Sequence, residues 1–337
     1  MSLPIVICDD SSFARKAIAR ALPDGWDVDI SFAENGKQAI AKIEKGLAHV
    51  LFLDLNMPVM DGYETMKIIR KFDLQTVVIV VSGDVQEEAR TRMMALGALE
   101  FIEKPINNAK LVSILNDFGL YEGDSKSLKR QQGNKTGSEL SDKIDLFREV
   151  CNVAMGQAGK NLAKLLDIFV ELPVPSVSIV HSNELSMAIA EIDRNDSVSA
   201  VSKGFVGKGL RGEAIILFND THVASLNALL GYDEQDELSE LETLMDVSNI
   251  IVGACLAGVA NQLQLNVTHT TPIILGMHCN LEELVSKNVS SWEELLMVEI
   301  AYSVSQANVN FELLLLLPKD CLDVTYERIA LIGEQSA

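Results

Sequence analysis

The sequence has few residues of the kinds that mark several common classes of protein. Its 337 residues include only 28 Lys and Arg against 48 Asp and Glu, which gives a net charge of −20. A nucleic-acid-binding groove is therefore not expected, because neutralising phosphates requires clustered basic side chains. The few cysteines lie far apart and form no Cys-x-x-Cys pair, so free thiols in a cytoplasmic protein are expected instead of a disulfide framework. They are Cys8, Cys151, Cys255, Cys279 and Cys321.

Long apolar segments are also lacking. No run of about 18 apolar residues appears, so no membrane insertion is expected. The apolar stretch over residues 1–8 runs into Asp9 and Asp10, which argues against a signal peptide. Hydrophobic residues make up 48% of the chain, so a sequence of this length has room for two or three domains with their own cores.

Residues 1–118 alternate short apolar runs with amphipathic ones. Five repeats of strand and helix predict a doubly wound parallel sheet covered by helices on both faces. The second strand contains Asp29 and is expected at an edge of the sheet, because central strands are apolar throughout. The predicted strands are 4–8, 28–33, 50–54, 77–82 and 100–102, and the predicted helices are 13–21, 36–46, 62–71, 86–96 and 106–117.

Hydrophobicity falls after residue 120, and Gly, Ser, Lys and Gln become frequent. This composition predicts a flexible linker over residues 121–138. The linker separates a first domain, residues 1–120, from a second region, residues 139–337. It carries a basic cluster, which is interpreted as part of a solvated tether, with docking to an acidic partner as the alternative.

Five polar side chains stand at the carboxyl ends of the predicted strands, where parallel α/β sheets gather functional groups. They are Asp9, Asp10, Asp54, Ser82 and Lys104. Three carboxylates at one sheet edge repel each other, and a hard cation such as Mg2+ relieves this repulsion. A carboxylate held in line with a metal-bound phosphoryl group can attack phosphorus, while Lys104 and Ser82 hold other phosphoryl oxygens.

The pattern resembles a response-regulator receiver domain, which is CheY-like and has a flavodoxin-like fold. Four segments carry the resemblance: the acidic pair after the first strand, LDLNMPVMDG, VVSGD and FIEKP. The resemblance implies that Asp54 accepts a phosphoryl group, that Ser82 and Lys104 bind it, and that Phe101 takes the aromatic switch position. It also implies a Mg2+ site, with Asp9 acting partly through water. The implied metal ligands are Asp9, Asp10, Asp54 and the backbone carbonyl of Asn56.

Residues 139–337 contain one polar pattern twice, 97 positions apart. It reads Asp145-x3-Glu149-x2-Asn152-x22-Pro175 and then Glu242-x3-Asp246-x2-Asn249-x22-Pro272. A helix, three strands and a helix are expected in each copy, so the region is interpreted as one pseudo-twofold α+β domain built by duplication. The predicted helices are 141–170, 220–230, 236–263 and 323–333, and the predicted strands are 176–182, 196–206, 212–218, 273–279, 295–304 and 309–317.

Each copy places a carboxylate and a carboxamide on one helix face. Glu149 and Asn152 lie three residues apart, as do Asp246 and Asn249. Neither pair includes the His or Cys of a metal or nucleophile site, and the five His show no ligand spacing. A carboxamide is a poor base, but it orients water by donating and accepting hydrogen bonds at once. Water attack on an acyl phosphate needs little more than such positioning.

The second region resembles the CheC/CheX/FliY family of chemotaxis phosphatases, and its two copies resemble CheC most. The resemblance implies hydrolysis of the aspartyl phosphate of a phosphorylated CheY-type response regulator, under control of the fused receiver. It implies a CheA-like sensor histidine kinase as phosphodonor and admits a CheD-like protein as a further partner. The implied catalytic residues are Glu149, Asn152, Asp246 and Asn249. The second copy departs from the family pattern, with Glu242 and the shorter Asp246, so the first copy is expected to be the more active.

Two other interpretations of the second region stay open. In one, it docks a chemotaxis or flagellar-switch partner without hydrolysing anything. In the other, the fused receiver is itself the substrate of the phosphatase, which is compatible with the enzymatic interpretation.

Overall fold

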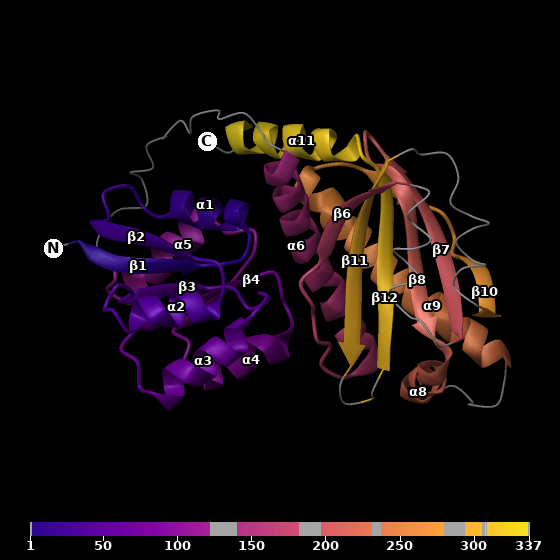
Figure 1. Cartoon of the computed structure of the whole chain (residues 1–337), viewed down its shortest axis with the longest axis horizontal. Helices are drawn as coiled ribbons and strands as arrows, with labels where there is room; N and C mark the ends of the chain where they lie inside the picture. Colours follow the sequence, from indigo (N-terminus) through magenta and orange to yellow (C-terminus); the bar gives the residue numbers. More distant parts are fainter. Residues whose placement is uncertain are drawn as a thin grey trace. The chain divides into compact units, whose positions relative to one another are not determined.

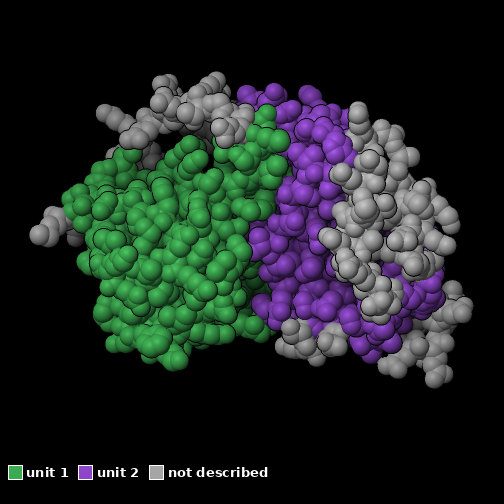
Figure 2. Space-filling model, viewed as in Figure 1, with its two compact units in different colours: residues 1–149, 337 green, residues 150–336 purple. Residues whose placement is uncertain are grey.

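The structure is a computed structural model that describes residues 2–121, 140–181, 197–230, 237–279, 294–304, 307 and 309–335. It divides into two compact units, residues 1–149 and residues 150–336 (Figure 2). Apart from Tyr121, the linker predicted over 121–138 lies outside the described residues. The boundary falls inside the long helix that opens the second region, because residues 140–149 of this helix belong to the first unit.

The first unit contains a five-stranded parallel sheet in the order β2-β1-β3-β4-β5 (Figure 1). The central strands are buried along their length, whereas Phe32 on β2 is 45% exposed, so the edge position expected for the second strand is confirmed. The strands are β1 (Leu3–Cys8), β2 (Val28–Ala33), β3 (Val50–Leu53), β4 (Val77–Ser82) and β5 (Glu100–Glu103).

Helices cover both faces of this sheet (Figure 1). One face packs Ile18 of α1 and Leu111 of α5 onto Ile7 and Phe52. Four of the helices begin at a side chain that accepts a hydrogen bond from a backbone N–H of the first turn, and these N-caps are Ser11, Asn35, Asp61 and Asn107. The helices are α1 (Ser12–Ala21), α2 (Gly36–Ile43), α3 (Gly62–Lys71), α4 (Glu87–Ala95) and α5 (Asn108–Asp117). The predicted flavodoxin-like architecture is therefore confirmed.

The second unit is built on an antiparallel sheet in the order β10-β7-β8-β12-β11-β6, with β9 paired to β7. Alternate residues of the strands form one buried face, which includes Ala200, Ile215 and Leu316. The strands are β6 (Ser176–His181), β7 (Val198–Gly207), β8 (Arg211–Asn219), β9 (Val267–His269), β10 (Ile273–Cys279), β11 (Glu294–Val304) and β12 (Val309–Pro318). Strand β9 was not predicted, because three residues are too short for a pattern.

Helices accompany this sheet (Figure 1), and four of them lie in the part of the chain that the structure describes. They are α6 (Leu140–Leu166), α8 (Asp220–Leu230), α9 (Glu237–Leu263) and α11 (Cys321–Gln335). Among the described residues, α9 is long and apolar enough to cross a membrane by length and composition alone. However, 61% of its apolar window is buried within the structure, as in the core helix of a folded domain.

The sheet of the second unit has a symmetric strand order. Exchanging β6, β7 and β8 for β10, β11 and β12 gives the same order in reverse. Pro175 and Pro272, which close the two copies of the sequence pattern, each directly precede the first strand of their set. The element order and the sheet order therefore agree with a pseudo-twofold arrangement.

Within the second unit, α6 and α9 approach closely. A Cβ atom on Gly258 would lie 2.8 Å from the Cα atom of Ala154, and the Nε2 atom of Gln262 donates to the carbonyl of Val150 at 2.8 Å. Gly253, five residues earlier on α9, has no atom within 4 Å of its Cβ position. The close approach of α9 to Ala154 thus depends on the missing Cβ atom of Gly258.

We expect Gly258→Ala to destabilise α9 relative to Gly253→Ala by about 1–3 kcal/mol, the usual cost of overpacking. Both changes gain about 1 kcal/mol of helix propensity, so this gain cancels and the difference reports the contact with Ala154. Native-state hydrogen exchange of α9 amides measures the opening free energy in each variant. Equal opening free energies would show that the two helices are not in backbone contact.

Candidate functional site

Three carboxylates meet at the carboxyl edge of the receiver-like sheet. Asp9 and Asp10 follow β1 and Asp54 follows β3, and the pairing of these parallel strands aligns Cys8 with Leu53. One oxygen from each carboxylate lies within 4.8 Å of the others. Asp9 and Asp54 are almost fully buried. The convergence expected from the sequence is therefore present.

Lys104 lies within this acidic cluster. It follows β5, and its Nζ atom lies 2.8 Å from Oδ2 of Asp9 and 3.4 Å from Oδ1 of Asp54. Ser82 ends β4, where its hydroxyl accepts a hydrogen bond from the backbone N–H of Asp84 at 3.1 Å. Phe101 is buried on β5. The fold thus gathers four of the five predicted strand-end groups into direct contact or close proximity, with Ser82 at the end of the strand between β3 and β5.

Burial sets the protonation behaviour of these groups. Desolvation raises the pKa of Asp54 well above its usual value, although Lys104 partly counteracts it. Burial likewise raises the pKa of Asp10 to about 6, against the opposing effect of Arg148. For Lys104, burial would lower the pKa, but the neighbouring carboxylates of Asp54 and Asp9 outweigh it and raise the pKa. The pocket therefore favours a bound cation or protons over free negative charge.

A divalent cation fits this donor set. Oδ2 of Asp54 is buried and has no hydrogen-bond partner among the described residues, and three carboxylates supply the hard oxygen ligands that Mg2+ prefers. Asp9, Asp10 and Asp54 would hold the ion. The predicted contribution of the Asn56 carbonyl, two residues after Asp54, stays a prediction.

Residues 140–149 of α6 contact the same pocket within the first unit. Oε1 of Glu149 lies 3.0 Å from Nζ of Lys104. Burial raises the pKa of Glu149 to about 7, and Lys104 counteracts part of this rise. The carboxylate of the first sequence motif is therefore an ion-pair partner of the lysine that follows β5.

Two other α6 side chains take part. Nη2 of Arg148 lies 2.8 Å from Oδ1 of Asp145 and 3.4 Å from Oδ2 of Asp10. Oδ2 of Asp145 accepts hydrogen bonds from the Ser12 hydroxyl at 2.8 Å and from the Phe13 N–H at 2.9 Å. No motif position marks Arg148, so the sequence pattern gives no sign of its place in this pocket.

The two carboxamides have different surroundings. Asn152 is buried on α6, whereas Asn249 is exposed on α9, together with Glu242 and Asp246 of its motif. The Oδ1 atom of Asn249 accepts a hydrogen bond from Nζ of Lys203 at 2.9 Å. Lys203 comes from β7, and no sequence signal linked it to Asn249 because 46 positions separate them.

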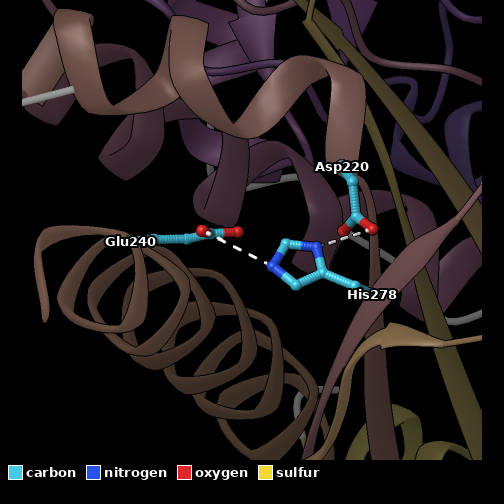
Figure 3. Close-up of side chains that lie close together, drawn as sticks. All are labelled: Asp220, Glu240 and His278. Atoms are coloured by element: carbon cyan, nitrogen blue, oxygen red, sulfur yellow. Dashed lines mark hydrogen bonds and ion pairs between the residues drawn. The ribbon is translucent and has the colours of Figure 1, made fainter. Parts of the chain in front are cut away.

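A separate cluster lies in the second unit. Nδ1 of His278 on β10 is 3.0 Å from Oδ2 of Asp220 at the start of α8, and Nε2 is 3.8 Å from Oε2 of Glu240 on α9 (Figure 3). The imidazole lies between the two carboxylates, and its side chain is 58% exposed. Sequence spacing gave no sign of this cluster, because its members come from three distant elements.

Comparisons with known proteins cover mainly the first unit. The response regulator receiver domain family matches residues 5–116. Chemotaxis protein CheY of Bacillus subtilis is 32% identical over 117 residues, which are 34% of this chain and 97% of that protein. A protein-glutamate methylesterase/protein-glutamine glutaminase of Geobacter sulfurreducens is 36% identical over 102 residues, 30% of this chain and 27% of the relative. This chain thus spans under a third of the length of such methylesterases.

Solved structures give weaker matches. The crystal structure of Thermotoga maritima FliY has 17% identity and a TM-score of 0.45, over 56% of this chain and 96% of that one. A CheX–CheY–BeF3–Mg2+ complex from Borrelia burgdorferi matches with 28% identity and a TM-score of 0.32, over 34% of this chain and 89% of that one.

The raised carboxyl pKa values predict how stability depends on pH. A carboxyl group whose pKa is higher in the folded state stabilises the fold below its unfolded pKa, and this stability is lost as pH rises through the folded pKa. Asp10 and Asp84 have pKa values of about 6 and Glu149 of about 7, raised first by burial. Without divalent metal, the free energy of unfolding of the first unit should therefore fall as pH rises from about 4 to about 7, the interval between the ordinary and the raised carboxyl pKa values.

Mg2+ should reduce this fall, because it compensates the charge of the deprotonated carboxylates. Urea unfolding followed by Trp26 fluorescence in a Trp292→Phe background, with EDTA or with Mg2+, measures both effects. A stability that rises with pH across this window in EDTA would contradict the burial of these carboxylates.

Proposed function

The chain belongs, through residues 5–116, to the response-regulator receiver family, and from this premise we propose that it is a chemotaxis signalling protein that accepts a phosphoryl group on Asp54 and also hydrolyses aspartyl phosphate. The second region is then a CheC-like phosphatase domain built by duplication. The symmetric strand order and the repeated motif support this duplication. The activities, partners and roles below are parts of this proposal.

Phosphorylation uses the carboxylate cluster. A carboxylate oxygen of Asp54 attacks the phosphorus atom of a phosphodonor, the bond from phosphorus to the donor breaks, and an acyl phosphate forms on Asp54. Lys104 and Ser82 hold phosphoryl oxygens, and Phe101 responds to the modification. A sensor histidine kinase is the physiological donor. Bound Mg2+ supplies charge neutralisation for the phosphoryl oxygens.

The contact between Glu149 and Lys104 is the observation that carries the phosphatase proposal. A motif carboxylate lies 3.0 Å from the lysine ammonium group that follows β5, close to the proposed acceptor Asp54. Burying a carboxylate is costly unless it is paired, so simple packing of the helix against the receiver does not explain a buried Glu149 at this position. Its pairing with Lys104 does explain it. Glu149 thus orients the catalytic helix on a receiver.

Asn152 then positions the attacking water. It follows Glu149 by three residues, and residues so spaced on an α-helix lie on the same face. Its carboxamide accepts one hydrogen bond from water and donates another. The water oxygen attacks phosphorus, the bond from phosphorus to Asp54 breaks, and the products are the Asp54 carboxylate and inorganic phosphate. The protons of the water leave with phosphate or pass to solvent.

The two motif copies serve different substrates. Residues 140–149 contact the chain's own receiver, so the first copy acts on the fused receiver. The second copy exposes Glu242, Asp246 and Asn249 on α9, where a separate phosphorylated CheY-type regulator can reach them. Because Glu149 and the phosphoryl group share Lys104, phosphorylation of Asp54 changes the free energy of helix docking, which is the condition for regulation by the receiver.

One observation favours the docking alternative for α9. The side-chain oxygen Oδ1 of Asn249 already accepts a hydrogen bond from Lys203, so it is less available to accept one from water. On this alternative, the second copy binds a chemotaxis or flagellar-switch partner, or a CheD-like protein, without hydrolysis.

Asp54→Asn should abolish phosphoryl labelling of the full chain by a histidine kinase or a small phosphodonor with Mg2+, because the carboxamide is not a nucleophile for phosphorus. Labelling with radioactive phosphodonor measures this. Asp84→Asn, which changes a buried carboxylate outside the proposed metal site, is the control and should keep its label. Normal labelling of Asp54→Asn would place the acceptor elsewhere.

Asn152→Ala should slow the loss of phosphoryl label from the fused receiver by about 10²-fold, the usual effect of removing one preorganised hydrogen-bonding group. Asn249→Ala should have little effect on this decay, because the second copy serves a separate regulator. That copy also carries Asp246 in place of Glu, and the Asn249 carboxamide is bonded to Lys203. Single-turnover decay after removal of the donor measures the rates.

Asn161→Ala and Asn261→Ala, on exposed positions of the same two helices, are the matched controls. If Asn249→Ala slows decay more than Asn152→Ala, the ranking of the two copies is wrong. If Asn152→Ala does not differ from Asn161→Ala, the docking interpretation replaces the enzymatic one for the first copy.

A further inference from the structure

Arg148 places a positive charge at the proposed metal site. Its Nη2 atom lies 3.4 Å from Oδ2 of Asp10, which is one of the three clustered carboxylates. No motif includes Arg148, and the proposed hydrolysis does not use it. The guanidinium therefore requires an explanation of its own.

The guanidinium is held in place by a second carboxylate. Arg148 pairs with Asp145 at 2.8 Å, and Asp145 is anchored at the first turn of α1 by Ser12 and Phe13. Backbone N–H groups at a helix N-terminus favour an anion, so this anchor strengthens the position of Asp145. Asp145 thus keeps Arg148 close to Asp10 while residues 140–149 contact the receiver.

We propose that Arg148 and Mg2+ compete for Asp10, so that metal binding loosens the contact of residues 140–149 with the receiver and this contact weakens metal binding. The inference rests on the proposed function only in taking Asp10 as a ligand of Mg2+; it does not require hydrolysis. Arg148 is a positioning residue here, since it acts on the metal site by charge and touches no reacting atom.

Charge repulsion makes the competition independent of which Asp10 oxygen binds the metal. If the metal takes Oδ2, it replaces the ion pair with Arg148 directly. If it takes the other oxygen, two positive charges still lie within a few ångströms in a partly buried site, where screening by water is weak. Arg148 keeps Asp145 as a partner after release, so its charge is not left buried and unpaired.

Thermodynamic linkage requires that the effect of Arg148 docking on Mg2+ affinity and the effect of Mg2+ on docking are equal in size. If docking of Arg148 lowers Mg2+ affinity by some factor, Mg2+ lowers the docking equilibrium by the same factor. Because phosphorylation requires the metal, a metal-loaded receiver would present Asp54 to a kinase with this segment of α6 loosened. The second copy has Met245 at the position of Arg148, so it lacks this coupling.

The test is Mg2+ affinity of the unphosphorylated full chain, measured by isothermal titration calorimetry. Arg148→Ala should bind Mg2+ more tightly, on the order of fivefold or more, the lower range of typical coupling factors. Arg148→Lys should fall between, because the charge is kept but the lysine ammonium group does not reproduce the guanidinium contacts with Asp145 and Asp10. Lys164→Ala removes the same charge from an exposed position of the same helix and should leave the affinity unchanged.

Hydrogen exchange provides the reciprocal measurement. Mg2+ should speed amide exchange over residues 141–149 in the unaltered chain and have no such effect in Arg148→Ala. Equal Mg2+ affinity in Arg148→Ala and Lys164→Ala, absence of Mg2+ binding, or unchanged exchange in the unaltered chain would overturn the proposal. If Arg148→Ala does not fold, the Mg2+ affinity of Arg148→Lys is compared with that of Lys164→Ala, and equal affinities would overturn the proposal. None of these readouts depends on phosphate release, so failure of the proposed phosphatase activity would remain distinguishable.

Discussion

The ammonium group of Lys104 is the charge on which the acidic pocket of the first unit depends. It lies within 3.4 Å of carboxylate oxygens of Asp9, Asp54 and Glu149, all of them buried. Removing charged groups from water costs several kcal/mol for each ion unless close partners compensate it. One lysine cannot neutralise three carboxylates, and Asp10 adds a fourth. The pocket therefore keeps an excess of negative charge, which further cations or protons have to neutralise.

The structure offers three ways to meet this excess. Protons can bind, as the raised pKa values of Asp10 and Glu149 show. A divalent cation fits the three clustered carboxylates and the unpartnered oxygen of Asp54. Arg148 supplies a third kind of positive charge, brought by the protein itself. Protons, a divalent cation and Arg148 all act on the same carboxylates, so binding of one weakens binding of the others. Protonation, metal binding and the contact with residues 140–149 are therefore coupled electrostatically.

The second unit follows from a different constraint, the packing of helices on an antiparallel sheet. Gly258 allows α9 to approach Ala154 of α6, and the strand order of the sheet is unchanged when β6, β7 and β8 are exchanged for β10, β11 and β12 and the order is reversed. The motif residues nevertheless differ in their surroundings. Lys203 binds the carboxamide of Asn249, but the residue 97 positions after Lys203 is Ile300, which cannot donate such a hydrogen bond to Asn152. Similar sequence spacing thus leads to dissimilar sites.

The sequence by itself determined the receiver fold and its carboxylate cluster, because alternating apolar and amphipathic runs dictate a parallel sheet and strand ends meet at one edge. It also determined those helices and strands of the second unit that the structure describes, apart from the short β9. Only the tertiary structure decided that Glu149 meets Lys104, that Arg148 meets Asp10 and that His278 lies between Asp220 and Glu240. These contacts join residues separated by 38 to 138 positions, and periodicity and spacing record only local geometry. Which distant charges are brought together depends on how whole elements pack, and no short pattern encodes that.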